Sequence, residues 1–540
     1  MSDMSGPLLA RRLWALRWAL AWALLAWAGL YAVVVVHAAG QTLLALTLLV
    51  MVAVSTWAYS SSRTSALRYL LPGIAAAWVF VIFPMLYTVG MSFTNYSSAH
   101  LLDKARARDV LLQERIATTG SQRSFHVERV GSEHLRIWLA ATGPLPALVT
   151  QAQPVRDLTS ITHDAAMTAA PIEWGLQVAT GPQASFALGD MGVSMPERIA
   201  LLPGLRRLSL RAPPGSDASA SAATYTLTSL REFTQTRPLY VTGADGALID
   251  QITGTVYRPD DREGFFVSAQ GERLQPGYRV NVGWAHYAQV FSEGKFREPF
   301  VSVLAWTVVF SALSVMGAGG LGLLLAVLLN WEGLRGREAY RLVLFLPYAV
   351  PGFISILVFK GLFNQNLGEI NLILHGLFGL RPAWFSDPMM AKAMLLIVNV
   401  WLGFPYMMVL CSGLIKSIPA DLYEASAVVG AGPLTNFWRI TLPLILKPLT
   451  PLLISAFAFN FNNFVLISLL TGGRPDQLDT AVPAGTTDIL VSYTWRIAFQ
   501  DSGQQFGLAA AISTVIFLIV AAITLVQMRF TRVAAQESRS

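Results

Sequence analysis

The sequence predicts an all-α polytopic membrane protein with about eight transmembrane helices and one inserted strand-rich domain. The 540-residue chain is 54% hydrophobic and 13% charged, and its mean hydropathy is +0.50, which is typical of an integral membrane protein. Eight apolar runs each approach the ~20 residues that a helix needs to cross the hydrocarbon core. Residues 95–300, between the third and fourth runs, contain no such run.

The predicted spans form two groups, three before the long polar stretch and five after it. They are 13–36, 42–59, 69–93, 303–329, 342–362, 393–415, 447–470 and 506–528. The first is longer than the ~7–15-residue apolar core of a signal peptide and two spans follow it directly, so we expect a retained helix. The chain thus divides into residues 1–94, an inserted domain at 95–299, a helical core at 300–530 and a tail at 531–540.

Basic residues in the short loops predict the orientation, because they concentrate on the cytoplasmic side. Those on one side are Arg11, Arg12, Arg63, Arg68, Arg335, Arg337, Arg341, Lys416, Arg439, Lys447, Arg529, Arg532 and Arg539. We therefore expect both termini and residues 414–446 in the cytoplasm and the inserted domain on the outer side. The net charge of +7 mostly reflects this bias, so it does not indicate nucleic acid.

The inserted domain should fold on its own and contact a soluble partner, because transport alone does not require it. Alternating segments at 225–228 and 279–282 predict strands, residues 243–246 predict a turn, and 104–117 predict a helix. The one cysteine, Cys411, lies inside a predicted span, so no disulfide or cysteine-based metal site is available.

Two absences limit how the chain could drive transport. The five later spans contain no Asp or Glu, and a proton-coupled carrier usually needs an intramembrane carboxylate. The chain also has no GxxxxGK[ST] phosphate loop. A non-catalytic permease driven by a separate ATPase explains both absences. The alternatives are an ion-coupled secondary sugar carrier, with sodium held by backbone oxygens, and a membrane-anchored sensor.

Residues 420–451 are unusually polar for a connection between two spans, and they predict two short helices. Asp421 can cap the first helix, Gly430 or Gly432 can end it in a left-handed conformation, and Pro433 fits the first turn of the second. We expect the second helix to stop near Pro443. The segment is predicted to be held by a cytoplasmic partner; an amphipathic turn in the headgroup layer is the alternative.

Two consecutive spans carry polar faces that predict a ligand site. The residues that share a face by helical spacing are Asn399, Leu402, Gly403 and Tyr406 in one span, and Phe459, Asn460 and Asn463 in the next. Amides and aromatic rings without formal charge suit a neutral, hydroxyl-rich sugar. The alternative is that these asparagines join helices by hydrogen bonds. In the fourth span, Gly317, Gly319, Gly320 and Gly322 are predicted close-packing positions, because small residues let helices approach.

The cytoplasmic segment resembles the EAA loop of ABC-importer membrane subunits. The resemblance is carried by Glu424-Ala425-Ser426 and Gly430, with Phe437, Ile440, Leu442 and Pro443 following. Further strings are similar to the larger permease subunits of bacterial maltose/maltodextrin importers, in the binding-protein-dependent transport permease family. These are FTNYSS (93–98), RPLYVTGADG (237–246), LPYAVPGFISILVFKGLFNQ (346–365), PAWFSDP (382–388), FAFNFNNF (457–464) and PAGTTDIL (483–490).

The resemblance implies a type I ABC importer permease fold in a bacterial inner membrane, with residues 95–299 in the periplasm. It implies a homologous second permease, a cytoplasmic ATPase dimer that binds ATP and Mg, and a periplasmic maltose-binding protein. The implied ATPase-coupling residues, in a loop at 420–443, are Glu424, Ala425, Ser426, Gly430, Ala431 and Phe437. The implied maltose contacts are Tyr348, Asn399, Leu402, Gly403, Tyr406, Phe459, Asn460 and Asn463. Val429 and Gly352 depart from the family's acidic and hydroxyl residues.

Overall fold

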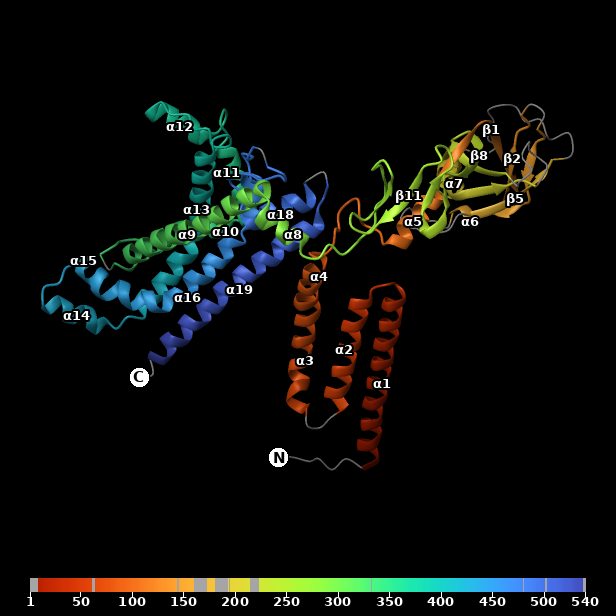
Figure 1. Ribbon diagram of the computed structural model, residues 1–540. Helices are drawn as coiled ribbons and strands as arrows, with labels where there is room; N and C mark the ends of the chain where they lie inside the picture. The colour runs from red at the N-terminus through yellow and green to blue at the C-terminus, as the bar shows by residue number, and fades with distance from the viewer. Residues whose placement is uncertain are drawn as a thin grey trace. The chain divides into compact units, whose positions relative to one another are not determined.

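The structure is a computed structural model that describes residues 8–60, 64–142, 145–159, 172–179, 193, 195–213, 223–331, 333–478, 480–500 and 503–537. The chain forms two compact units, which we describe separately: residues 1–98 with 281–540, and residues 99–280. The first unit is helical and the second is rich in strands (Figure 1). The predicted fold class is confirmed.

The helical unit begins with three long apolar segments. They are α1 (Leu8–Ala38), α2 (Thr42–Ser60) and a third helix that runs through α3 (Ser65–Ala77), the π-helix η2 (Trp78–Ile82) and α4 (Phe83–Met91). The third span therefore crosses in one piece, with a single π-turn inside it. These segments agree with the first three predicted spans.

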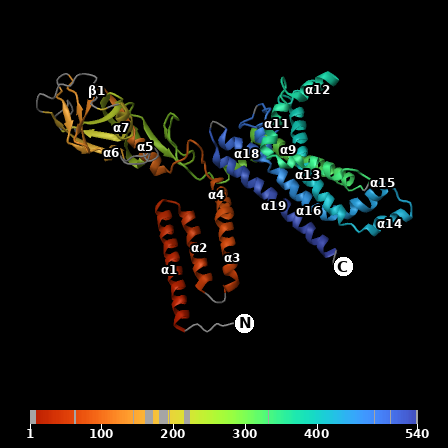
Figure 2. The ribbon, with the colours of Figure 1, turned by 180° about the vertical axis from the view of Figure 1, so that it is seen from behind.

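The rest of the unit forms the helical core. Its elements are α8 (Ala285–Ser292), α9 (Gly294–Asn330), α10 (Arg337–Ala349), α11 (Gly352–Leu362), α12 (Glu369–Phe378), α13 (Pro388–Lys416), α14 (Ala420–Val428), α15 (Pro433–Asn436), the π-helix η6 (Phe437–Thr441), α16 (Leu442–Phe461), α17 (Phe464–Leu470), α18 (Leu490–Phe499) and α19 (Phe506–Glu537). Helix α14 lies at one end of α13 and α16, and α12 and α18 lie at the other (Figures 1 and 2).

Among the described residues, seven helices are long and apolar enough to cross a membrane, and one bent pair brings the number to eight. The bent pair is the fifth predicted span, in which α10 and α11 meet at 91°. The break falls at Val350 and Pro351, because a residue before proline is held extended and proline cannot donate a backbone hydrogen bond.

The helix that follows α14 does not stop near Pro443, so that prediction was wrong. It runs from Pro433 to Phe461 as one 29-residue span. The π-turn η6 precedes Pro443, and the Leu442 N–H donates to the Phe437 carbonyl, five residues back. A proline is tolerated directly after this turn, because the α-type hydrogen bonding is already interrupted there. The helix breaks instead at Asn462, and α17 continues beyond it.

Helices α9 and α13 pack closely at glycine positions. A Cβ atom built on Gly322 would lie 2.6 Å from Met407 Cβ and 2.7 Å from the backbone nitrogen of Met408. Gly317 faces Val400 in a similar way, so both are close-packing positions as predicted. Gly320 has no atom within 4 Å of such a Cβ, so the same prediction was wrong there.

The strand-rich unit contains two sheets. The strands of the larger sheet are β1 (Arg115–Val130), β2 (His134–Leu139), β3 (Leu148–Thr150), β4 (Gln153–Pro154), β5 (Ile172–Val178), β6 (Leu208–Arg211), β7 (Thr224–Ser229) and β8 (Glu232–Pro238), in the order β1-β8-β7-β6-β5-β3-β2-β4. Strand β1 pairs with β8 and also with β2, so the sheet closes on itself like a barrel. Strand β7 contains the predicted strand 225–228.

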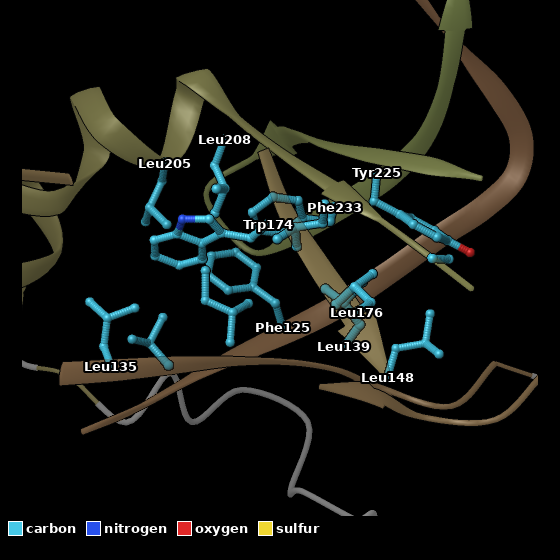
Figure 3. Packing of buried hydrophobic residues seen from close by; sticks show 14 of the residues in the cluster. Phe125, Leu135, Leu139, Leu148, Trp174, Leu176, Leu205, Leu208, Tyr225 and Phe233 are labelled. Atoms are coloured by element: carbon cyan, nitrogen blue, oxygen red, sulfur yellow. The ribbon is translucent and has the colours of Figure 1, made fainter. Parts of the chain in front are cut away.

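Alternating apolar residues of these strands fill the inside of the closed sheet. Phe125, Trp174 and Phe233 point toward one another there, and Leu205 of α7 (Met195–Arg207) covers one end (Figure 3). These side chains are almost completely buried, which supplies the apolar core that a domain without disulfides needs.

The smaller sheet packs against a helix. Its strands, in the order β13-β12-β11-β10-β9, are β9 (Tyr240–Thr242), β10 (Leu248–Asp250), β11 (Val256–Asp260), β12 (Phe265–Ser268) and β13 (Arg273–Leu274). Ala107 and Leu111 of α5 (Lys104–Gln113) join its core. The unit also contains the short helices α6 (Arg156–Thr159) and η5 (Ala244–Gly246), and η5 falls in the predicted turn.

Several predicted boundaries differ from the observed ones. Helix α5 ends at Gln113 because β1 begins two residues later. The segment 279–282 is not a strand and contributes only an isolated bridge at Asn281. Helix α8 and the start of α9 belong to the helical unit, whereas the prediction placed residues up to 299 in the inserted domain. Helix α19 extends to Glu537, so most of the predicted tail is helical; residues 538–540 lie outside the described part of the chain.

Candidate functional site

A cavity of about 660 Å³ lies among the core helices. All eight predicted substrate contacts line it: Tyr348, Asn399, Leu402, Gly403, Tyr406, Phe459, Asn460 and Asn463. Helical spacing had grouped seven of these residues into two faces, and the structure brings the two faces together. Tyr348 joins them from the end of α10, beside the break at Pro351. Their contact with a substrate stays a prediction.

Three asparagines link α13 to the end of α16 inside this cavity. The Asn399 amide donates to Asn460 Oδ1 at 2.6 Å and accepts from Asn463 Nδ2 at 3.2 Å. Asn399 is only 7% exposed, so it mainly joins the helices and fixes its two neighbours. The alternative reading, in which these asparagines join helices, therefore holds for all three, while their contact with a ligand stays a prediction. Asn462 turns away and donates to the Ala458 carbonyl.

The remaining cavity wall is aromatic, aliphatic or hydroxyl-bearing. Sequence reasoning missed Ser314, Val315 and Ala318 of α9, Ser455 and Ala456 of α16, and Val465 and Leu466 of α17. Ser314 and Ala318 are four residues apart, a spacing that could have identified the α9 face. Gly352 also lines the cavity, and a Cβ atom built there would meet no atom within 4 Å.

The predicted helix-turn-helix after α13 is present, but the residue in the capping position of its first helix is not the predicted one. Pro419 is the residue before α14, and Asp421 lies in the first turn without a capping hydrogen bond, so the predicted cap was wrong. Gly430 has φ +75° and ends the helix in the left-handed region, as predicted. Pro433 occupies the first turn of α15, also as predicted.

The predicted coupling residues lie on or beside an exposed surface. Glu424, Ala425 and Gly430 are exposed, whereas Ser426, Ala431 and Phe437 are half-buried. Large apolar side chains surround them in a group that we call the α14 patch: Leu422, Val428, Val429, Leu434 and Trp438. Val428 is 88% exposed, and Val429 follows as the residue that ends α14. Exposed apolar side chains clustered at a helical turn indicate a docking surface.

One side-chain hydrogen bond joins α14 to the helix that begins at Pro433. The Tyr423 hydroxyl lies 2.9 Å from Thr441 Oγ1, and Thr441 is the last residue of the π-turn η6. The same turn of α14 is closed by Ser426, whose hydroxyl donates to the Tyr423 carbonyl at 2.8 Å. The turn and the following helix are therefore fixed to each other near the exposed patch.

A buried charge network at the opposite end of the core was not predicted. Arg496 of α18 donates to Asp488 Oδ2 at 2.8 Å and to the Asp476 carboxylate. Asp488 also accepts from the Ser492 hydroxyl at 2.8 Å and from the Gly485 N–H at 2.8 Å. Burial raises the pKa of the Asp488 carboxyl, while the Arg496 guanidinium and these two donors oppose the rise.

This network holds the segment between α17 and α18 in place. Ile489, beside Asp488, belongs to the same buried cluster as Leu466 and Ile467 of α17, and Leu466 lines the cavity. A signal was present in the sequence, because Asp488, Ser492 and Arg496 recur at intervals of four residues, a spacing that predicts a shared helix face, although Asp488 lies just before α18. Among the residues that the structure describes, no group of three His, Cys, Asp or Glu side chains could hold a metal ion.

The helical core and the closed sheet match two known protein families. Residues 318–536 match the binding-protein-dependent transport system inner membrane component family. Residues 102–283 match the P2 domain of the maltose transport system permease protein MalF. These matches define the class: a multi-span inner-membrane component of a binding-protein-dependent transport system.

Relatives with curated names identify the particular family. The chain is 45% identical to the maltose/maltodextrin transport system permease protein MalF of Klebsiella aerogenes over 517 residues, covering 93% of this chain and 94% of that protein. It is 44% identical to the proteins of the same name from Escherichia coli K12, over 93% of this chain and 94% of the relative, and from Yersinia pestis, over 93% and 92%. The chain belongs to the MalF family of transport permeases.

Proposed function

We propose that this chain is the larger permease subunit of an ATP-driven ABC importer, and that with a homologous second permease it forms the path for maltose and maltodextrins. A periplasmic binding protein would deliver the sugar, and a cytoplasmic ATPase dimer would bind ATP and Mg. Membership of a binding-protein-dependent permease family argues against the ion-coupled carrier.

The cavity is the observation that carries the proposal. Its described lining holds amides, hydroxyls and aromatic rings and no Asp, Glu, Lys, Arg or His side chain. Amides both donate to and accept from sugar hydroxyls, and rings such as Phe459 and Tyr348 can cover the apolar C–H faces of a glucose unit. A neutral α-glucoside fits such a wall, whereas the charge of an ion would have no oppositely charged side chain beside it among the described lining residues.

The exposure of the cavity wall supports a second permease. Phe459 is 71% exposed and Tyr348 is 54% exposed, although both belong to the wall of an intramembrane cavity. A sugar path cannot open sideways into lipid, because sugar hydroxyls would lose their hydrogen bonds there. A second subunit that covers this side would complete the path.

The ends of the core suggest the other partners. The α14 patch would dock on the ATPase, with Glu424, Ala425, Ser426, Gly430, Ala431 and Phe437 at or beside the contact. The excess of basic residues in the loops at this end supports a cytoplasmic location for both termini and the α14 patch, and a periplasmic location for the strand-rich unit. There the strand-rich unit would meet the binding protein.

Uptake in reconstituted vesicles tests the sugar assignment. The chain is purified with its second permease and ATPase, and uptake of radiolabelled maltose is measured with ATP inside the vesicles and binding protein outside. We expect Asn460→Ala to reduce maltose uptake roughly tenfold, because the sugar and the buried Asn399 amide lose their hydrogen-bond partner at a cost of about 1–3 kcal/mol. Asn462→Ala is the matched control and should transport normally, since Asn462 does not line the cavity. Equal uptake by both variants would exclude Asn460 from the sugar site.

A further inference from the structure

We propose that the hydrogen bond between Tyr423 and Thr441, which we call the coupling contact, transmits movement of α14 to the substrate cavity. The proposal rests on the proposed function, because it assumes that an ATPase moves α14. It assigns positioning roles to two residues that lie outside the predicted coupling set.

The coupling contact replaces a local hydrogen bond. A threonine inside a helix usually donates to the carbonyl four residues back, as Thr450 does to Leu446 at 2.7 Å in the same helix. Thr441 instead meets the Tyr423 hydroxyl, 18 residues away in sequence, at 2.9 Å. Thr441 is 6% exposed and Tyr423 is half-buried, so water competes little for this contact.

The contact falls where the helix can most easily change its register. Thr441 ends the π-turn η6, in which the Leu442 N–H bonds to the Phe437 carbonyl five residues back. π-turns inside helices are uncommon and often mark functional positions. Beyond it, Pro443, Pro448 and Pro451 each lack a backbone donor, so the first turns of α16 hold fewer hydrogen bonds than an ordinary helix.

The far end of the same helix forms the cavity wall. Phe459 and Asn460 lie in its last turn, and Asn463 follows directly after it. A shift of the helix at Thr441 would therefore displace these side chains against Asn399, which is fixed on α13 and bonds to both amides. The 2.6 Å bond between Asn399 and Asn460 is one contact that such a shift would change.

A double-mutant cycle tests the proposal in the complete complex. The chain is reconstituted with its second permease, ATPase and binding protein, and maltose uptake and ATP hydrolysis are measured in the same vesicles. The variants are Tyr423→Phe, Thr441→Val, the two combined, Thr441→Ser, and the control Thr435→Val, in which an exposed hydroxyl of α15 is removed. The readout is maltose transported per ATP hydrolysed, a ratio that a general loss of folded complex does not alter.

We expect Tyr423→Phe and Thr441→Val each to lower this ratio roughly 2- to 10-fold, the range that corresponds to one half-buried hydrogen bond. The combined variant should be no worse than either single one, because both remove the same contact. Thr441→Ser should keep the ratio of the unaltered chain, because serine retains the hydroxyl. Thr435→Val should also keep this ratio.

Three results would overturn the proposal. The first is an unaltered ratio in both single variants, and the second is additive losses in the combined variant. The third is a fall of the ratio in Thr435→Val as large as that in Thr441→Val. If Thr441→Val fails to assemble, Tyr423→Phe still decides, since it removes one oxygen atom and keeps the ring. Absence of maltose uptake by the unaltered chain would refute the proposed function itself, whereas normal uptake with normal variants would refute only the coupling contact.

Discussion

Replacement of Arg496 by methionine should destabilise the helical unit strongly, because it leaves Asp488 as a buried carboxylate without its cation. Asp488 is fully buried, and Arg496 is its charged partner at 2.8 Å. Removing one member of a buried ion pair typically costs about 3–5 kcal/mol, since the remaining charge stays desolvated. Two hydrogen bonds, from Ser492 and Gly485, remain with Asp488 and place the expected loss near the lower end of that range.

The loss should be visible as a lower melting temperature of the purified complex in detergent. A change of 3 kcal/mol corresponds to roughly 6–12 °C for a domain of 150–250 residues, and to a smaller shift for a larger unit such as this one. Where unfolding is irreversible, half-lives at one temperature are compared instead. Arg474→Met is the matched control, since Arg474 is an exposed arginine of the same segment.

Two further measurements show whether the charge of Asp488 is the cause. The combined variant Asp488→Asn with Arg496→Met should be more stable than Arg496→Met alone, because no charge is then buried. Burial raises the pKa of the Asp488 carboxyl above its unfolded value, and the methionine variant lacks the cation that opposes this rise. A raised pKa gives stability that is present at low pH and lost as pH rises, so the stability defect of Arg496→Met should become smaller as the pH is lowered. A defect that does not change with pH, or equal melting temperatures for Arg496→Met and Arg474→Met, would refute the reasoning.

Two other predictions follow from packing and orientation. Gly322→Ala should destabilise the core by about 1–3 kcal/mol, because its Cβ would overlap the backbone of α13, while Gly320→Ala, with open space beside it, should be neutral or slightly stabilising in the same melting assay. Equal stability of the two variants would contradict the close approach of α9 and α13. In intact cells with a permeabilised outer membrane, a membrane-impermeant maleimide should label Ser229→Cys but not Val429→Cys, both of which are exposed positions. The buried Cys411 provides the unlabelled background, and labelling of Val429→Cys without opening the inner membrane would contradict the proposed orientation.

Features with a local physical cause could be predicted from the sequence. Helical spacing placed Asn399, Leu402, Gly403 and Tyr406 on one face, because the period of a helix does not depend on its neighbours. The left-handed end of α14 at Gly430 followed from the freedom of glycine at positive φ. The lengths of the spans could also be predicted, because a helix needs about 20 apolar residues to cross the hydrocarbon core whatever its neighbours are.

Features that depend on tertiary context could not be predicted in this way. Pro443 suggested a helix end, but the π-turn before it lets the helix continue to Phe461. Asp421 suggested a cap, but the helix begins at Ala420 with Pro419 in the capping position, so the Asp421 carboxylate lies two positions too far along. The Asp488–Arg496 pair was missed because hydropathy ignores whether a charge has a partner, although the four-residue intervals from Asp488 through Ser492 to Arg496 were visible in the sequence.

Helix α14 is proposed as the point where ATP-driven movement enters a chain that has no phosphate loop of its own. ATP-dependent uptake of maltose by the reconstituted complex measures this for Glu424→Lys, which reverses an exposed charge beside the α14 patch, and for Gly430→Pro, which cannot adopt the observed φ of +75°. The account predicts that the unaltered chain transports maltose and that both variants assemble in the membrane but lose uptake. Undiminished uptake by either variant would contradict it.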